Sequence, residues 1–386
     1  MPHPALPVPA PAAAAAAPPK RAVILAFSTA CVLALCCTML VRRDAGFPLF
    51  SAAAPLPPVH TPILFSRYGD CAPVDWDAAP AVEQPELWLC SGVYAGARAL
   101  NFTLAAPPLQ SSFVSMFMST SAEGRGGGMW APVETLIFLH ALRSASSSSS
   151  AATPLVVDVG VNVGYFSQLA LALGATVVGF EPQARAQPYL ARTARANGAP
   201  AARRWALFPC AIGSTRGHIS MSAPEKWGFS QVDYVDGVKA PLPEGSDYGG
   251  HDSAAPQRVP MVRLADILSP AARVSLLKVD TEGFEAEIFK SVDAELLARV
   301  EHVVVEVKTE GGRATLWRLL GHAGFGCRQY KEHYTERPGV LQGAWVDTQG
   351  LSPADVAARL ARELLPCDAG GAGPEDMWFS RAPFPA

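Results

Sequence analysis

The chain has 386 residues, of which 49% are hydrophobic and 17% are charged, and its formal net charge is −3 at pH 7. This length allows one large domain or two small ones, with enough apolar residues for a sizeable core. Neither a basic excess nor a basic patch is visible, which argues against a nucleic-acid partner. The eight cysteines include no Cys-x-x-Cys pair, so we expect no zinc site.

Proline and alanine crowd the beginning of the chain, and residues 1–21 are expected to form a disordered tail. Ala22–Val41 follow as twenty residues without a charge. As a helix they would span about 30 Å, the thickness of the bilayer hydrocarbon. A cleaved signal peptide is the alternative, but its apolar core would be only about 7–15 residues long. Arg42 and Arg43 follow directly, so we predict an uncleaved membrane anchor.

The orientation of this anchor is weakly specified, because basic residues flank it on both sides. We expect a short cytosolic tail, with the remainder of the chain in the lumen of the endoplasmic reticulum or Golgi. Asn101-Phe102-Thr103 favours this orientation, because it is an N-glycosylation sequon, which is used only in the lumen. In such an oxidising compartment Cys71 and Cys90 could form a disulfide.

Residues 42–125 are expected to form a stem and an accessory region, rich in proline and alanine at first and then carrying scattered apolar clusters. Val133–Leu142 has the pattern of a helix that packs on the following domain. Ser144–Ser150 is a serine-rich run, typical of a flexible connector. We place the main folded domain over residues 126–386.

After the serine run, apolar strands alternate with glycine turns and helices. The expected strands are Leu155–Val159, Thr176–Phe180, Trp205–Cys210, Leu276–Val279 and Val303–Val307, with closing strands near Gly326–Tyr330 and Met377–Ser380. The expected helices are Tyr165–Leu173, Gln183–Asn197, Glu282–Val292 and Thr315–Ala323. This alternation predicts an α/β fold of the Rossmann-like type, a parallel sheet with helices on both faces. Ligands of such sheets bind at the carboxyl ends of the strands.

The first of these strands runs into a glycine turn, Asp158-Val-Gly160-Val-Asn162-Val-Gly164. The glycines allow a sharp turn and a close approach to a ligand, and the next helix points its N-terminus at that ligand. A dinucleotide fingerprint would need glycine where Asn162 and Tyr165 stand. The turn therefore favours a ligand without a pyrophosphate, such as a methyl donor built from methionine and adenosine.

Two carboxylates accompany the turn. Glu181 ends the second strand, where it could accept two hydrogen bonds from a ribose diol. Asp158 could meet the ammonium of the methionine part, directly or through water. Alternatively, Asp158 is a helix cap or a turn residue and Glu181 a solvated strand end. Their joint spacing on this topology favours the binding roles.

Several segments resemble the FkbM family of methyltransferases over roughly Trp130–Tyr330: DVGVNVGYFSQLA, VVGFEPQ, LLKVDTEGFEAEIFKSV and VVVEVK. The most specific is the family's K-x-D-x-E-G-x-E pattern, which begins at Lys278. The resemblance implies a Rossmann-like O-methyltransferase with S-adenosylmethionine as cofactor. It also implies that Glu181 binds the ribose and that four residues hold the methionine part: Asp158, Gly160, Asn162 and Gly164.

The chain departs from the family pattern in places. Val161 replaces the usual alanine, and the third strand runs into Cys210 without an acid for the adenine amino group. The segment from Asp236 to Gln257 is longer than usual. These departures leave the adenine contact open.

Methyl transfer from a sulfonium needs the acceptor oxygen about 3–3.5 Å behind the methyl, and a group that takes the acceptor's proton. Asp280 is our first candidate for that group, Glu282 the second and Glu306 the third. Alternatively, Asp280 or Thr281 only caps the following helix. Lys278 could form an ion pair with Glu306. Alternatively, such a pair would have only a structural role.

Residues of two further segments are candidates for contacts to the acceptor. Trp130, Pro132 and Glu134 could form one wall of the site, although ordinary packing is the simpler explanation. Lys226–Ser230 resembles the family's variable substrate loop. The histidines show no spacing typical of metal ligands, so we expect no metal.

Two other functions remain open. A lumenal glycosyltransferase would have the same tail, anchor and stem, and Asp75-Trp76-Asp77 has the form of a site for a metal and a sugar diphosphate. That triplet lies in the proline-rich stem without a preceding strand. A catalytically silent domain that binds S-adenosylmethionine is the second alternative. The expected acceptor is a small molecule or glycan hydroxyl, and the anchor favours a glycan.

Overall fold

The computed structural model describes much of the chain after residue 70. The described ranges are 71–80, 82, 86–95, 98–107, 130–147, 153–222, 231–235, 238–239, 257–307, 309–331, 351–367 and 376–385. Within these ranges no helix has both the length and the apolar character needed to cross a bilayer. Ala22–Val41 lie outside them, so the membrane anchor stays a prediction.

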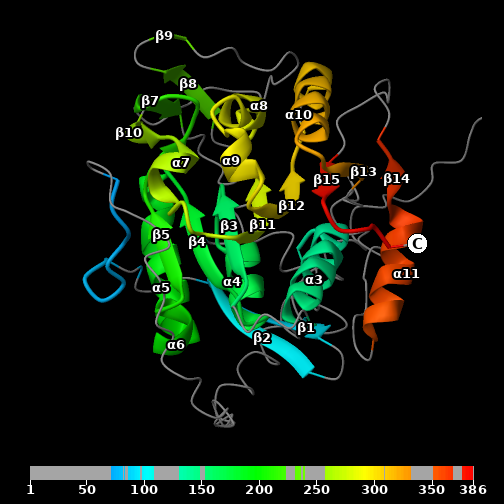
Figure 1. Ribbon diagram of the computed structural model, residues 1–386. Coiled ribbons are helices and arrows are strands. Elements are labelled where there is room, and N and C mark those ends of the chain that lie inside the picture. The colour runs from blue at the N-terminus through cyan, green and yellow to red at the C-terminus, as the bar shows by residue number, and fades with distance from the viewer. Residues whose placement is uncertain are drawn as a thin grey trace, which may run out of the picture. The chain divides into compact units, whose positions relative to one another are not determined.

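A mixed sheet of eight strands forms the centre, in the order β14-β13-β15-β12-β11-β3-β4-β5 (Figure 1). Its parallel part consists of β3 (Leu155–Val159), β4 (Thr176–Phe180), β5 (Trp205–Phe208), β11 (Val274–Val279) and β12 (Val300–Val305). The remaining strands are β13 (Gly326–Tyr330), β14 (Leu365–Pro366) and β15 (Asp376–Ser380). The predicted α/β class and the five predicted parallel strands are confirmed.

The sheet is not parallel throughout, because β15 is inserted between β12 and β13 and runs antiparallel to both. Our expectation of a purely parallel sheet was therefore wrong at this edge. An antiparallel strand needs no helical crossover to reach its neighbour, so the end of the chain can close the sheet in this way.

Alternate side chains of each central strand enter two separate apolar cores. Val156 faces one core and Val157 the other, as the two-residue period of a strand requires. On the first face lie α3 (Pro132–Ser147), α4 (Tyr165–Ala172), α5 (Gln187–Asn197) and α11 (Pro353–Glu363). On the second lie α7 (Leu264–Ile267), α8 (Glu285–Phe289), α9 (Ala294–Leu297) and α10 (Glu310–His322). The two short helices η2 (Ala184–Ala186) and α6 (Ala199–Ala202) flank α5.

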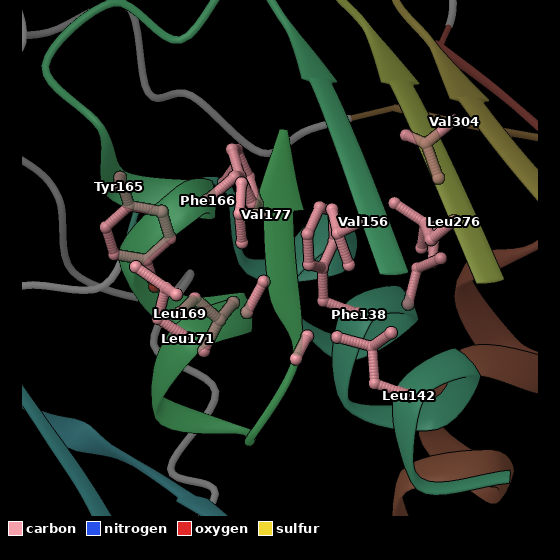
Figure 2. Packing of buried hydrophobic residues seen from close by; sticks show 14 of the residues in the cluster. Phe138, Leu142, Val156, Tyr165, Phe166, Leu169, Leu171, Val177, Leu276 and Val304 are labelled. Carbon is pink, nitrogen blue, oxygen red and sulfur yellow. The ribbon is translucent and has the colours of Figure 1, made fainter. Parts of the chain in front are cut away.

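Helix α3 packs directly on the sheet, so it belongs to the core of the main domain. Figure 2 shows Phe138 and Leu142 of α3 beside Val156 and Leu276 of two adjacent strands. The helix continues to Ser147, so the first half of the expected flexible connector at Ser144–Ser150 is helical instead. A good helix that is already anchored by burial extends at small cost through serine and alanine.

A hairpin formed by β1 (Glu86–Ala95) and β2 (Arg98–Ala106) covers α4 and α5. Phe102 meets Tyr165 of α4 with ring centroids 5.6 Å apart. Asn197, at the end of α5, clamps the backbone of Thr103, accepting its N–H at 2.8 Å and donating to its carbonyl at 2.7 Å. The described part of the expected accessory region thus packs on the main domain.

A smaller sheet stands beyond the carboxyl ends of the central strands, in the order β6-β10-β7-β8-β9. Its strands are β6 (Ala211–Ile212), β7 (Gly217–Ser222), β8 (Gln231–Val235), β9 (Val238–Lys239) and β10 (Gln257–Val262). These strands occupy the long segment between β5 and β11 that sequence patterns left unassigned.

The structure decides the cysteine pairing that the sequence left open. Cys71 bonds Cys210 and not Cys90, with the two Cα atoms 5.8 Å apart, and Cys327 bonds Cys367. Cys90 is a free, buried thiol in β1. The reason is that the segment after Cys71 runs beside β5, where the N–H of Val74 donates to the carbonyl of Leu207. Sequence distance alone could not reveal this contact.

Buried His302 should make the stability of the fold depend on pH. It lies on β12 at 1% exposure, and burial followed by repulsion from His140 lowers its pKa to about 4. In the unfolded chain the pKa is about 6.5, so between these values only the unfolded state binds the proton. Stability should therefore fall as the pH falls through this window.

We expect His302→Leu to remove about 2 kcal/mol of the stability difference between pH 7.5 and pH 5, measured by urea unfolding at both pH values. His322→Leu, which changes an exposed histidine, serves as the control. Equal pH dependence in the wild type and in His302→Leu would contradict the prediction.

Candidate active site

A pocket of about 420 Å³ opens where the central parallel strands end. Its walls come from the turn after β3, the ends of β4, β11 and β12, the helix α3 and the smaller sheet. The strand order reverses at β3, whose neighbours are β4 and β11. Such a switch point is where open α/β sheets bind their ligands.

The turn after β3 has three residues in the left-handed region: Gly160 (φ 89°), Asn162 (φ 54°) and Gly164 (φ 91°). A Cβ on Gly160 would lie 1.7 Å from the carbonyl oxygen of Asp280, so only glycine permits this approach. Gly160 and Asn162 line the pocket, whereas Gly164 packs against Trp205 behind it. Gly164 thus starts α4 without itself reaching the pocket.

Glu181 lines the pocket at the end of β4 and is only 2% exposed. Its carboxylate accepts the N–H of Asn162 at 2.7 Å and that of Gln183 at 3.0 Å. Burial raises its pKa to about 7, although these hydrogen bonds work in the opposite direction. Each oxygen keeps a lone pair for a ligand hydroxyl, as the predicted ribose contact requires.

Asp158 does not line the pocket, and neither does Gly164, whereas the three other residues expected at the donor do: Gly160, Asn162 and Glu181. It is 1% exposed and accepts a hydrogen bond from the Ser167 hydroxyl at 2.6 Å. Burial raises its pKa, and the charge of Lys278 opposes that shift. Asp158 is thus a buried residue of β3 that holds Ser167 of α4; it does not cap α4, whose N-cap is Gly164.

Three carboxylates gather on the other side of the turn. Asp280, Glu282 and Glu306 all line the pocket, and each offers an oxygen within 4.8 Å of the others. The backbone N–H of Asp280 donates to the carbonyl of Val159 at 2.9 Å, which fixes the end of β11 beside β3. The three candidate bases are therefore brought together, close enough for a cation to bind between them.

Lys278 pairs with Asp280 and not with Glu306, which corrects our expected ion pair. Its ammonium lies 2.9 Å from Asp280 Oδ2 and 5.1 Å from the ring centroid of Phe166. The reason is that Asp280 directly follows β11 and continues its extended chain, in which residues two apart point to the same face. Burial lowers the pKa of Lys278, but attraction to Asp280 and to two other carboxylates, Glu134 and Asp158, raises it overall.

The helix after β11 begins at Glu285 and not at Glu282, as we had expected. Glu282 (φ 59°) and Gly283 (φ 106°) are left-handed, which no α-helix accepts. Glu285 stabilises this turn, because its carboxylate accepts hydrogen bonds from the N–H and the hydroxyl of Thr281 and from the N–H of Gly283. Neither Asp280 nor Thr281 caps the helix, whose N-cap is Phe284.

Part of the pocket lining comes from distant parts of the chain. Trp130 and Glu134 line the pocket, as proposed for one wall of the site, whereas Pro132 does not. Tyr330 of β13 and Asp376 of β15 also line it. The sequence marked those strands but contained no signal that these two side chains face the site.

Lys226–Ser230, the expected substrate loop, lie outside the described residues. At the adenine end expected for a donor, Cys210, Ala211 and Ile212 line the pocket. The described lining there includes no acid after β5, as the sequence indicated.

The strand order, the glycine turn and the acids at the strand ends define a Rossmann-like α/β domain with a pocket at the carboxyl ends of its strands. The family model for the methyltransferase FkbM domain matches residues 158–326. The methyltransferase sdnD of Sordaria araneosa is 30% identical over 195 residues, which cover 45% of this chain and 73% of that protein. The chain belongs to the FkbM methyltransferase family.

Two solved structures show a weaker likeness. The methyltransferase FkbM from Methylobacillus flagellatus KT matches with a TM-score of 0.31 and 12% identity, over 59% of this chain and 43% of that one. A precorrin-6y C5,15-methyltransferase from Geobacter metallireducens GS-15 matches with a TM-score of 0.27 and 10% identity, over 64% of this chain and 86% of that one. Scores this low support no further inference.

Gly160→Ala should destabilise the protein strongly, because its Cβ would overlap the carbonyl of Asp280. Gly174→Ala is a matched control, since Gly174 has a similar φ of 97° but no atom within 4 Å of the added Cβ. We expect a loss of about 1 kcal/mol for Gly174→Ala, from backbone strain alone. Gly160→Ala should lose at least about 3 kcal/mol, measured by denaturant unfolding. Equal losses would show that the close approach is unimportant.

Proposed function

We propose that this protein is an S-adenosylmethionine-dependent O-methyltransferase. The observation that carries the proposal is the placement of Glu181 and of the acid Asp280 on two sides of the Gly160 turn, within one pocket. A donor with a ribose at Glu181 and its methionine part along the turn would present its sulfonium toward Asp280. Bound S-adenosylmethionine would supply an electrophilic methyl group with a good leaving group.

The charges of the pocket fit a cationic donor. The described lining contains one ammonium group, that of Lys278, and several carboxylates: Glu134, Glu181, Asp280, Glu282, Glu306 and Asp376. Carboxylates near a sulfonium stabilise its charge, whereas they would repel a pyrophosphate. The backbone N–H of Asn162 is taken by Glu181, which also distinguishes this turn from one that cradles phosphates.

In the proposed reaction Asp280 accepts the proton of the acceptor hydroxyl as the oxygen attacks in line. Lys278 fixes the direction of the Asp280 carboxylate through the 2.9 Å ion pair. Glu282 and Glu306 stand within reach of the same point and are the second and third candidates for the base. Excluding water from this pocket strengthens each of these interactions.

The binding role of Glu181 predicts a pH-dependent donor affinity. Because its pKa lies at about 7, it is largely neutral at pH 6 and largely ionised at pH 8. Only the ionised carboxylate accepts hydrogen bonds with both oxygens. The affinity for S-adenosylmethionine should therefore rise about tenfold from pH 6 to pH 8.

Isothermal titration calorimetry of the wild type and of Glu181→Gln at both pH values tests this prediction. Protonation of the donor itself changes the measured affinity of both proteins equally, so the comparison isolates the effect of Glu181. Glu181→Ala should weaken donor binding by about 10–100-fold at pH 8. Wild-type affinity in Glu181→Ala would remove the donor site from the place that we propose.

The catalytic role of Asp280 predicts a loss of turnover without a loss of binding. Asp280→Asn should lower the rate of methyl transfer by about 100-fold or more, because general-base catalysis contributes that much, and should leave donor affinity within about twofold. Asp77→Asn changes an exposed acid and should leave turnover unchanged. Unchanged turnover in Asp280→Asn would exclude Asp280 as the base.

We predict methyl transfer without a metal, although the three carboxylates lie close enough to hold one. The ammonium of Lys278 already neutralises part of their charge. Enzyme dialysed against EDTA should keep its rate within about twofold, because no step above needs a Lewis acid. Loss of activity that Mg²⁺ or Mn²⁺ restores would contradict this prediction.

For the acceptor we propose a hydroxyl of a glycan or of another small molecule, reached by an enzyme that Ala22–Val41 anchor in the endomembrane system with its catalytic domain in the lumen. The anchor and stem support this choice. Transfer of a labelled methyl group from the donor onto fractionated extracts identifies the acceptor. Donor binding with no labelled product in any fraction would favour the catalytically silent alternative.

The main support for the glycosyltransferase alternative was the Asp75-Trp76-Asp77 triplet, read as a site for a metal and a sugar diphosphate. Asp75 and Asp77 do not line the pocket, so the triplet no longer supports this alternative. Asp75 Oδ1 accepts the N–H groups of Asp77 and Ala78 in its own turn, at 3.0 and 3.4 Å. Trp76, between the two acids, packs against Trp205 with ring centroids 4.7 Å apart. The triplet therefore serves to fasten this segment to β5.

A further inference from the structure

The sequon Asn101-Phe102-Thr103 lies on β2, whose side chains alternate between the core and solvent. Leu100 and Phe102 are buried against the main domain, whereas Asn101 is exposed and Thr103 half-buried. Because strand residues two apart share a face, the asparagine and the threonine of the sequon point to the same outer side. The two side chains that glycosylation requires are thus presented together.

The hairpin leaves room at Asn101. The pairing of β1 with β2 shifts between Cys90 and Val93, so Asn101 lies opposite a bulge without a paired residue. Within the described residues no hydrogen bond holds its side-chain amide. The strand is fixed instead through the backbone of Thr103, which Asn197 clamps from both sides. A group attached at Asn101 would therefore break no side-chain hydrogen bond among the residues that the structure describes.

An independent observation concerns the compartment. The disulfides Cys71–Cys210 and Cys327–Cys367 join positions 139 and 40 residues apart and fasten the stem and the last strands to the domain. Disulfides of this structural kind form and persist in oxidising compartments and are rare in the cytosol. The endoplasmic reticulum is such a compartment, and it is also where N-glycosylation takes place.

We propose that Asn101 carries an N-linked oligosaccharide. This inference rests on the lumenal orientation proposed above. The Asn101 amide nitrogen would form a bond to the anomeric carbon of the first sugar and lose one proton. The bond from that carbon to the lipid diphosphate carrier breaks, and the lipid diphosphate leaves. In Figure 1 the hairpin lies toward the amino ends of β3 and β4, so the glycan would leave the pocket at their carboxyl ends open.

The test uses the full chain, expressed in a eukaryotic cell line with a flexible C-terminal extension that carries a reporter sequon, Asn-Ala-Thr. Peptide N-glycosidase in ¹⁸O water converts each glycosylated asparagine to labelled aspartate, which mass spectrometry locates. We expect labelling at Asn101 and at the reporter. Thr103→Ala and Asn101→Gln should abolish the label at position 101, whereas Thr103→Ser, which keeps the sequon, should retain it.

The reporter separates two kinds of failure. A labelled reporter with unlabelled Asn101 would overturn the glycosylation site while leaving the lumenal orientation intact. An unlabelled reporter and unlabelled Asn101 would overturn both the site and the orientation. Methyl transfer by Asn101→Gln should equal that of the wild type, because the hairpin contributes no residue to the pocket lining described here.

Discussion

The site depends on one close approach, that of the Gly160 turn to the carbonyl oxygen of Asp280. A side chain at position 160 would lie within bonding distance of that oxygen, so the end of β3 can meet the end of β11 only through glycine. The N–H of Asp280 completes the contact by donating to Val159. This contact fixes the separation between the donor residues on one side and the acids on the other.

Charge is arranged around this contact in a buried network. Lys278 lies under the acids at 3% exposure, and its bond to Asp280 orients the proposed base. Such a cation is costly to bury alone and is stable here because carboxylates surround it. Glu134 connects the network to α3, so the helix before the family's core segment contributes to the electrostatics of the site. Glu285 plays a different part, since it shapes the left-handed turn that carries Glu282.

The segments outside the family match are joined to the same core. The hairpin packs on α4 and α5, and Cys71 fastens the preceding segment to Cys210, which itself lines the pocket. The last strand, β15, contributes Asp376 to the pocket and ties the end of the chain into the sheet. A domain defined by the family match alone would lack a wall of the pocket and both disulfides.

The sequence by itself determined the parallel strands, the glycine turn and the acids at the strand ends. These features are local, because apolar runs, glycine spacing and the acids that follow strands can be read within a few residues. Hence the sequence alone predicts Gly160, Glu181 and Asp280 as site residues, and all three line the pocket. The resemblance to the FkbM family came from the same segments.

Only the tertiary structure decided which distant residues meet. The partner of Cys71, the counterion of Lys278 and the approach of Tyr330 and Asp376 to the pocket depend on strand order and on which face each side chain takes. Asp158 lies in the segment that the sequence predicted, but it does not line the pocket, because its side chain points toward Ser167. Contacts between segments far apart in sequence leave no periodic pattern, so sequence reasoning had no means to find them.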